Sequence, residues 1–192
     1  MRVRRIGERR ALLAHRRAVA PRRGVVRRKA EVVAAVCAAV DIPVIPKLTP
    51  NVDDIAVIGR AALEAGASAL CAINTAGPGY TESHGHPVLS NRMGGMSGKG
   101  VLPTTLKALK ALRAETDVPL IGCGGLSCAA DCRAAIHCGA TILGIGSGLT
   151  GMNTEEVQHY FADLARQART QEGPKTSQDR SQRSQEQPRT DH

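Results

Sequence analysis

The 192-residue sequence has very few aromatic residues and no long apolar run. It contains two Tyr, one Phe and no Trp. Modules that stack nucleic-acid bases need aromatic side chains, so this composition counts against nucleic-acid binding. No apolar run reaches the roughly 18–20 residues that span a membrane, and no apolar signal-peptide core follows the basic start. We therefore expect no membrane protein, and the abundant small aliphatic residues favour a sheet covered by helices.

The sequence also lacks a basic excess outside its first 29 residues. That segment holds twelve Lys and Arg and one acidic residue, whereas residues 30–169 hold ten basic and twelve acidic residues. The net charge of +9 therefore comes from the amino-terminal segment, and the part that can fold is slightly acidic. A phosphate-binding basic arm, a solvated tail and a mis-assigned start all stay open for residues 1–24. Residues 169–192 are polar, and we expect them to be disordered.

The cysteines follow neither a disulfide framework nor a metal motif. They fall in segments with helix or strand patterns, which predicts free thiols in a reducing, cytoplasmic compartment. The spacing of the last four matches no zinc or iron–sulfur pattern. His84 and His86 lie near Glu82, but no third ligand at a strand end accompanies them, so we expect no metal site. The six cysteines are Cys37, Cys71, Cys123, Cys128, Cys132 and Cys138.

Helix and strand patterns alternate along residues 25–168, which we expect to form one domain. A Gly-rich stretch over 74–100 is long enough to be functional rather than a simple connection. The predicted strands are 42–48, 69–73, 118–122 and 141–146. The predicted helices are 25–40, from Asn51, Asp53 or Asp54 to Gly66, 102–112, from Ser127 to Gly139, and from Asn153 or Thr154 to Leu164.

Two sequence phrases occur twice in corresponding places. DIPVI at 41–45 matches DVPLI at 117–121, and GASAL at 66–70 matches GATIL at 139–143. Each pair marks a strand, then a helix closed by Gly-Ala before the next strand, so the units repeat as β and α with parallel strands. The fold class is therefore α/β. Four strands are half of a (β/α)8 TIM barrel, and we expect the C-terminal half of one.

Two glycine-rich turns follow the last two predicted strands. Gly124 and Gly125 follow the third strand, and Gly146 and Ser147 follow the fourth. Backbone N–H groups in such turns, together with a helix N-terminus, suit a phosphate dianion. Barrels commonly bind phosphate in the loops after their seventh and eighth strands. The two turns together predict a phosphate site whose four N–H groups converge.

Three further residues near strand ends have chemistry of their own. Lys47 ends the first strand after an apolar run, so its ammonium group should face a ligand rather than the core. Asn74 follows the second strand and offers a donor and an acceptor to an amide or pyrimidine edge. Gly98 lies in the GGMSG segment of the long loop and would allow a flat ring to approach the backbone. The plainer alternatives are a surface Lys and an Asx turn.

The chain resembles the C-terminal half of class 1 dihydroorotate dehydrogenases. Six motifs occur in that family's order, and the resemblance is continuous over about 25–168. The motifs are KLTPN at 47–51, INT at 73–75, PVLSN at 87–91, GGMSG at 94–98, GCGG at 122–125 and GIGS at 144–147.

The resemblance implies an FMN-containing (β/α)8 barrel that oxidises dihydroorotate to orotate in pyrimidine synthesis. Asn74 and Thr75 would bind this small pyrimidine substrate. The resemblance leaves the electron acceptor open, and a separate electron-transfer subunit is one route to it. Residues assigned to FMN are Lys47 at the pyrimidine end of the flavin, Ile73 and Gly98 at the ring, and Gly124, Gly125, Gly146 and Ser147 at the phosphate.

One departure from the family pattern concerns the catalytic base. In the family this Cys or Ser lies on a loop before the strand that corresponds to 42–48, and residues 1–24 do not resemble that part. No residue of this chain is therefore predicted to be catalytic, and the isolated chain is expected to be inactive. A complementary N-terminal half or a homo-oligomer would complete it. A dihydropyrimidine dehydrogenase-like enzyme, an inactive barrel remnant and a basic-arm binding protein remain alternatives.

Overall fold

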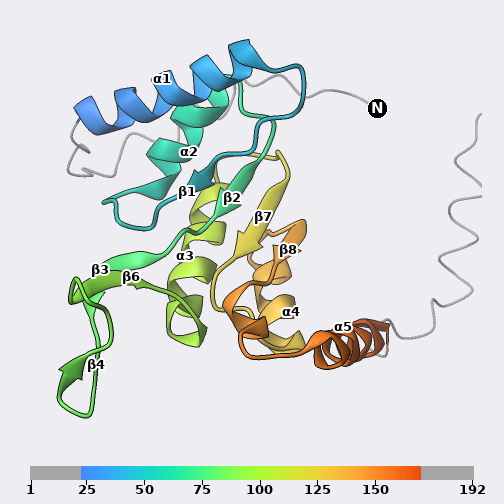
Figure 1. Ribbon diagram of the computed structural model, residues 1–192. Helices are drawn as coiled ribbons and strands as arrows, with labels where there is room; N and C mark the ends of the chain where they lie inside the picture. Colours follow the sequence, from blue (N-terminus) through green and yellow to red (C-terminus); the bar gives the residue numbers. More distant parts are fainter. Residues whose placement is uncertain (1–22, 170–192) are drawn as a thin grey trace, which may run out of the picture.

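The computed structural model describes residues 23–169, and its centre is a four-stranded sheet (Figure 1). The strands of this sheet are β1 (Lys47–Leu48), β2 (Leu70–Ala72), β7 (Leu120–Cys123) and β8 (Ile142–Gly144). The helices are α1 (Arg23–Ala39), α2 (Ile55–Glu64), α3 (Leu102–Arg113), α4 (Ala129–His137) and α5 (Thr154–Arg169). The predicted basic segment and polar tail lie outside the described residues, except for the residues that begin α1 and end α5.

The four strands run parallel in the order β1-β2-β7-β8, which is also their order along the chain. Lys47 pairs with Cys71, and Leu70 pairs with Leu120. Ile121 pairs with Ile142 on the far side of β7. The predicted α/β class and parallel pairing are therefore confirmed. Within residues 23–169 the sheet does not close into a barrel, because β1 and β8 each have only one strand neighbour.

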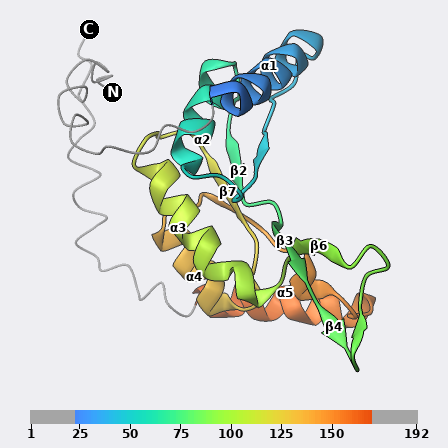
Figure 2. The same cartoon turned by 90° about the vertical axis from the view of Figure 1, so that its left-hand side faces the viewer.

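Helices α2, α3 and α4 cover one face of the sheet (Figures 1 and 2), and α1 packs against α2. The core lies under these helices, where Leu70 and Leu120 of the sheet and Leu109 of α3 are fully buried. The opposite face has no helix among the described residues. Ile45 and Ile142 are 43% and 52% exposed. Such exposure is expected of side chains that would point into the interior of a barrel, because the barrel is not closed here.

The first predicted strand, 42–48, is mostly too irregular to count as a strand, and only its last two residues pair fully. The preceding segment still runs beside β2, because the carbonyl of Val44 accepts from Ser68 N at 2.9 Å and that of Pro46 accepts from Cys71 N at 3.0 Å. Pro43 and Pro46 have no N–H to donate in return. Up to Lys47, this segment therefore accepts hydrogen bonds from the segment of β2, and its prolines donate none in return.

The helix starts agree with the sequence in two cases and differ in one. Asp54 is the N-cap of α2, and its side chain accepts from Ala56 N. Asn153 and Glu156 cap α5 reciprocally, each side chain accepting from the other's backbone N–H. Ser127 was the expected cap of α4, and this was wrong: Cys128 occupies the N-cap position, and the Ser127 hydroxyl donates to Asp131 at 2.9 Å.

The Gly-rich stretch between β2 and α3 forms two small antiparallel hairpins that the sequence analysis does not predict. The inner one pairs β3 (Ala76–Tyr80) with β6 (Met93–Met96), and the outer one pairs β4 (Glu82–Ser83) with β5 (His86–Pro87). Together they project from the carboxyl end of the sheet (Figure 2). All six cysteines are free, as expected, although only Cys132 and Cys138 are buried. No helix in the described part is long and apolar enough to cross a membrane.

Replacement of the N-cap Asp54 tests how much this residue stabilises α2, whose buried side chains form part of the core. We expect Asp54→Ala to lower the free energy of unfolding by about 1 kcal/mol, because the N–H of Ala56 loses its acceptor. Asp53→Ala is the matched control, since Asp53 is exposed and has no hydrogen-bond partner among the described residues. Urea unfolding followed by circular dichroism measures both. Equal midpoints for the two variants would contradict this capping role.

Candidate functional site

The predicted site residues gather at the carboxyl end of the sheet, because all four strands run parallel. Backbone hydrogen bonds join the strand ends there. Asn74 N donates to the carbonyl of Leu48 at 2.7 Å, and Ile73 N donates to that of Cys123 at 2.5 Å. The segments after β1, β2 and β7 are therefore held side by side.

Lys47 lies on the face of the sheet that the helices leave uncovered. The next residue, Leu48, is 4% exposed and belongs to the core, whereas Lys47 is exposed. Successive side chains of a strand point to opposite faces, so the ammonium group is directed away from the helices. No carboxylate of the described residues forms an ion pair with it. This placement agrees with a Lys that faces a ligand.

The two glycine-rich turns lie against each other, as a shared phosphate site requires. A Cβ added at Gly148 would be only 2.8 Å from the carbonyl oxygen of Leu126, so the turn after β8 touches the turn after β7. Within the described part of the chain, the predicted four N–H groups have no hydrogen-bond acceptor. Their convergence on one point stays a prediction. The four residues are Gly124, Gly125, Gly146 and Ser147.

The glycines of these turns fall into two kinds. Gly124 and Gly125 have φ of +121° and +78°, and a Cβ at Gly125 would lie 2.6 Å from Leu102 N. At these two positions the backbone conformation of the fold itself therefore requires glycine. Gly146 has φ of −123°, and nothing lies within 4 Å of its would-be Cβ. Gly98 has φ of +81° and equally open surroundings. Space beside Gly98 and Gly146 is therefore available to a ligand.

Thr105 lies under the turn that follows β7 and helps to hold it in place. The sequence analysis does not identify this residue. Its hydroxyl is fully buried and lies 2.8 Å from the carbonyl oxygen of Gly124, to which it can donate. A Thr on the apolar face of α3, between Leu102 and Leu109, is the signal that could have revealed it. Ile73, which was assigned to the ring, is 2% exposed and also lies beneath Gly124.

Asn74 and Thr75, the predicted substrate residues, are both exposed beyond the end of β2. The side-chain oxygen of Asn74 accepts from Thr75 N at 2.9 Å, a local turn contact that leaves its NH2 group free for another acceptor. Asn51 was expected at a helix start, but its side chain joins two loops instead. It accepts from Gly77 N at 2.9 Å and donates to the Thr75 carbonyl at 3.4 Å.

A buried carboxylate next to the glycine turns also escaped the sequence analysis. Asp131, in the first turn of α4, is 6% exposed and accepts from Lys99 Nζ, Ser127 N and Ser127 Oγ at 2.8–3.1 Å. Burial by itself raises the pKa of this carboxyl group, but the hydrogen bonds from Lys99 and Ser127 outweigh it and lower the pKa to about 2. Asp131 is thus ionised at neutral pH.

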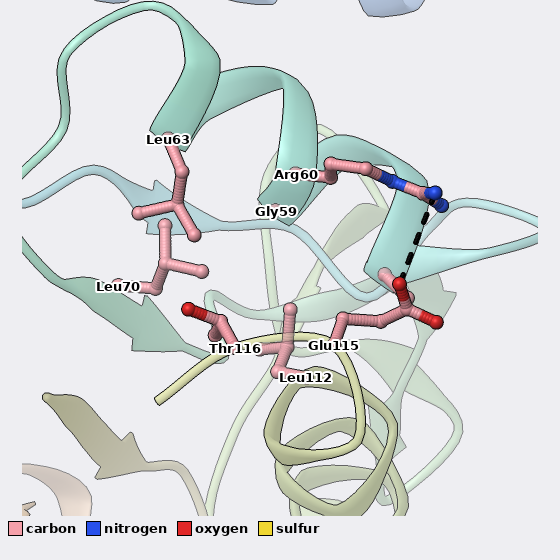
Figure 3. Close-up of a pocket in the computed structure, with 8 residues that line it drawn as sticks. Gly59, Arg60, Leu63, Leu70, Leu112, Glu115 and Thr116 are labelled. Carbon is pink, nitrogen blue, oxygen red and sulfur yellow. Dashed lines mark ion pairs between the residues drawn. The ribbon is translucent and has the colours of Figure 1, made fainter. Parts of the chain in front are cut away.

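Two hollows of the described surface lie in different places. A cavity of about 30 Å³ lies between α2 and α3 near Leu70, the first residue of β2 (Figure 3). Arg60 and Glu115 form an ion pair of 3.8 Å at its rim. It has room for about one water molecule and lies at the opposite end of β2 from Asn74. A larger groove of about 440 Å³ borders β3, β6 and Ser97.

No group of three or more possible metal ligands occurs in residues 23–169. His84 and His86 lie exposed at the turn between β4 and β5.

Comparison with known proteins places the chain in a family. A family model described as dihydroorotate dehydrogenase matches residues 23–166, which include every predicted site residue. The chain belongs to the dihydroorotate dehydrogenase family.

Three relatives carry the name dihydroorotate dehydrogenase B (NAD(+)), catalytic subunit. That of Thermococcus kodakarensis is 45% identical over 120 residues, or 62% of this chain and 40% of the relative. That of Methanosarcina mazei is 45% identical over 119 residues, covering 62% and 38%. That of Cutibacterium acnes is 41% identical over 114 residues, covering 59% and 37%. The chain thus spans about two fifths of the length of these relatives.

The low pKa of Asp131 predicts how acid affects stability. Its pKa in the folded state, about 2, lies below the ordinary 3.8, so its stabilising contribution is complete above about pH 4 and is lost as pH falls toward 2. We expect Asp131→Asn to lower the urea midpoint at neutral pH and to flatten its decline between pH 4 and pH 2. Asp53→Asn, at an exposed position, should keep the wild-type profile. Parallel profiles for Asp131→Asn and wild type would refute this assignment.

Proposed function

We propose that this chain supplies the phosphate-binding half of an FMN-dependent dihydroorotate dehydrogenase, which oxidises dihydroorotate to orotate in pyrimidine synthesis. The main support is the contact between the turns after β7 and β8, with four backbone N–H groups that have no acceptor among the described residues. A phosphate dianion satisfies such donors at a helix N-terminus. Membership of the family and the names of the relatives support the reaction.

The residues of this chain fit FMN in both charge and shape. Gly124, Gly125, Gly146 and Ser147 would bind the phosphate group through their N–H groups, and the open space at Gly146 leaves room for it. Lys47 would place a positive charge at the pyrimidine end of the ring, where negative charge develops on reduction. Gly98 and Ile73 would border the ring. When bound, FMN supplies the hydride acceptor for the oxidation.

Substrate binding is assigned to Asn74 and Thr75. The free NH2 group of Asn74 can donate to a carbonyl or carboxylate oxygen of dihydroorotate, and the exposed Thr75 hydroxyl can donate or accept. Asn51 bonds both the Thr75 carbonyl and Gly77 N, so it keeps this segment beside the end of β1. These residues would orient the substrate rather than move its proton.

The proton of the substrate needs a base from outside the described residues. Cys71 lies on the uncovered face beside Lys47, but burial, together with neighbouring Cys123, raises the pKa of its thiol, so little of it is in the thiolate form that could accept a proton. We therefore propose that a complementary (β/α)4 half brings the base and closes the barrel. The words "catalytic subunit" in the relatives' names support a further electron-transfer subunit. We place the reaction in the cytoplasm.

Gly146→Ala separates phosphate binding from folding. The would-be Cβ meets nothing within 4 Å and φ is negative, so we expect an unfolding midpoint close to that of wild type. The methyl group would occupy the proposed phosphate space and weaken FMN binding about tenfold or more. Gly24→Ala in α1 is the control, because its Cβ also meets nothing within 4 Å and it lies in neither the phosphate turns nor the Gly98 segment. Flavin fluorescence quenching measures binding, and equal affinities for both variants would contradict the phosphate site.

Complementation tests the proposed activity directly. The 192-residue chain should bind added FMN only weakly, so that it loses the flavin on purification, is colourless and does not oxidise dihydroorotate, because the base and half of the flavin contacts come from elsewhere. Coexpression with the preceding part of the Thermococcus kodakarensis relative should give a yellow complex that forms orotate. A complex that stays colourless and inactive would favour a barrel remnant without activity. A chain that is yellow and active alone would show that the base lies within it.

A further inference from the structure

One ion pair connects the segment that carries Gly98 to the turn that follows β7. Lys99 comes directly after Gly98, and its Nζ lies 2.9 Å from Oδ1 and 2.8 Å from Oδ2 of Asp131. Asp131 stands in the first turn of α4, directly after the turn formed by 124–128. Besides the packing of Val101 and Leu102 beside Gly124 and Gly125, the proposed ring-binding and phosphate-binding segments are therefore joined through one buried carboxylate.

The same carboxylate also holds the turn itself. Oδ2 of Asp131 accepts from Ser127 N at 3.1 Å and from Ser127 Oγ at 2.9 Å. Ser127 is the residue at which the glycine turn passes into α4. Because Asp131 is almost fully buried, each of these contacts replaces hydration that its charge has lost on folding. Removing one donor therefore leaves the charge under-compensated and loosens the others.

Val101, at the end of the segment 97–101, is held in the core and accepts from the Thr105 hydroxyl, but Gly98, Lys99 and Gly100 before it have few contacts of their own. The residues on either side, Gly98 and Gly100, have no side chain, and nothing lies within 4 Å of a Cβ built at either one. The N–H of Val101 bonds back to the Gly98 carbonyl, but this contact is internal to the segment. The side chain of Lys99 is 62% exposed, so it contributes little to the core. Its ion pair is the anchor of this segment.

We propose that Asp131 is a positioning residue, which binds Lys99 and Ser127 together and so fixes the Gly98 segment against the phosphate turn. This role rests on the proposed function. The carboxylate sets the distance between the ring-binding end and the phosphate-binding end of the proposed flavin site. Asp131 itself touches neither substrate nor cofactor.

Hydrogen exchange of the full chain, read by mass spectrometry without flavin, tests the anchor. In Lys99→Met we expect amides of both 97–101 and 124–128 to exchange about tenfold faster, as the loss of a charged hydrogen bond predicts. Lys99→Arg should restore slow exchange. The urea midpoint of Lys99→Met should fall, because the buried carboxylate of Asp131 loses its counter-charge, whereas Lys99→Arg should keep it. Asp131→Asn should speed exchange in the same two segments.

The control variant is Lys107→Met, on the exposed side of α3, which should exchange like wild type. A merely local role for Lys99 would change exchange in 97–101 alone. Unchanged exchange of 124–128 in Lys99→Met would therefore overturn the proposal, whatever the flavin result.

Titration with FMN then tests the positioning role, with exchange of 124–128 as the readout. We expect about tenfold weaker binding in Lys99→Met and near-normal binding in Lys99→Arg and Lys107→Met. Equal affinity of Lys99→Met and wild type would overturn the positioning role. If FMN protects no amide of the wild-type chain, the proposed function fails, and the flavin-free exchange alone decides whether Asp131 joins the two segments.

Discussion

The parallel pairing of β2 with β7 is the constraint on which the site depends. Leu70 and Leu120 face each other at the start of this pair and are both fully buried under α3. This burial sets the register, because a shift by one residue would turn the same side chains to the uncovered face. With the register set, the ends of β2 and β7 lie level, and Ile73, Asn74 and Gly124 come together there.

The alternating pattern of the sequence was sufficient to predict the parallel sheet and its helices. The two repeated phrases marked corresponding places in the β-α units, and glycine after the last two strands marked their carboxyl ends. Those signals are local, since they depend on apolar spacing, caps and turn residues within a few positions. The late start of the first strand, at Lys47, was also readable in principle, because Pro43 and Pro46 cannot donate to a neighbouring strand.

Long-range polar contacts were not predictable from such signals. The side chain of Asn51 bonds residues about 25 positions away, and Lys99 reaches Asp131 across 32 positions. Ser127 looked like a helix cap, yet its hydroxyl donates to Asp131, and the backbone shifts the cap by one residue. The hairpins over 76–96 form from Gly-rich sequence with little alternation. Each of these features needs the fold before its partner is known.

The backbone bonds between strand ends have a consequence for ligand affinity. Leu48 accepts from Asn74, Cys123 accepts from Ile73, and Asn51 ties the next loop to both strands. Loops that are free before binding lose conformational entropy when a ligand orders them, and this loss weakens affinity. Here the ordering takes place when the sheet folds. The loops at this edge are thus ordered before any ligand arrives, and a ligand that binds there loses less conformational entropy.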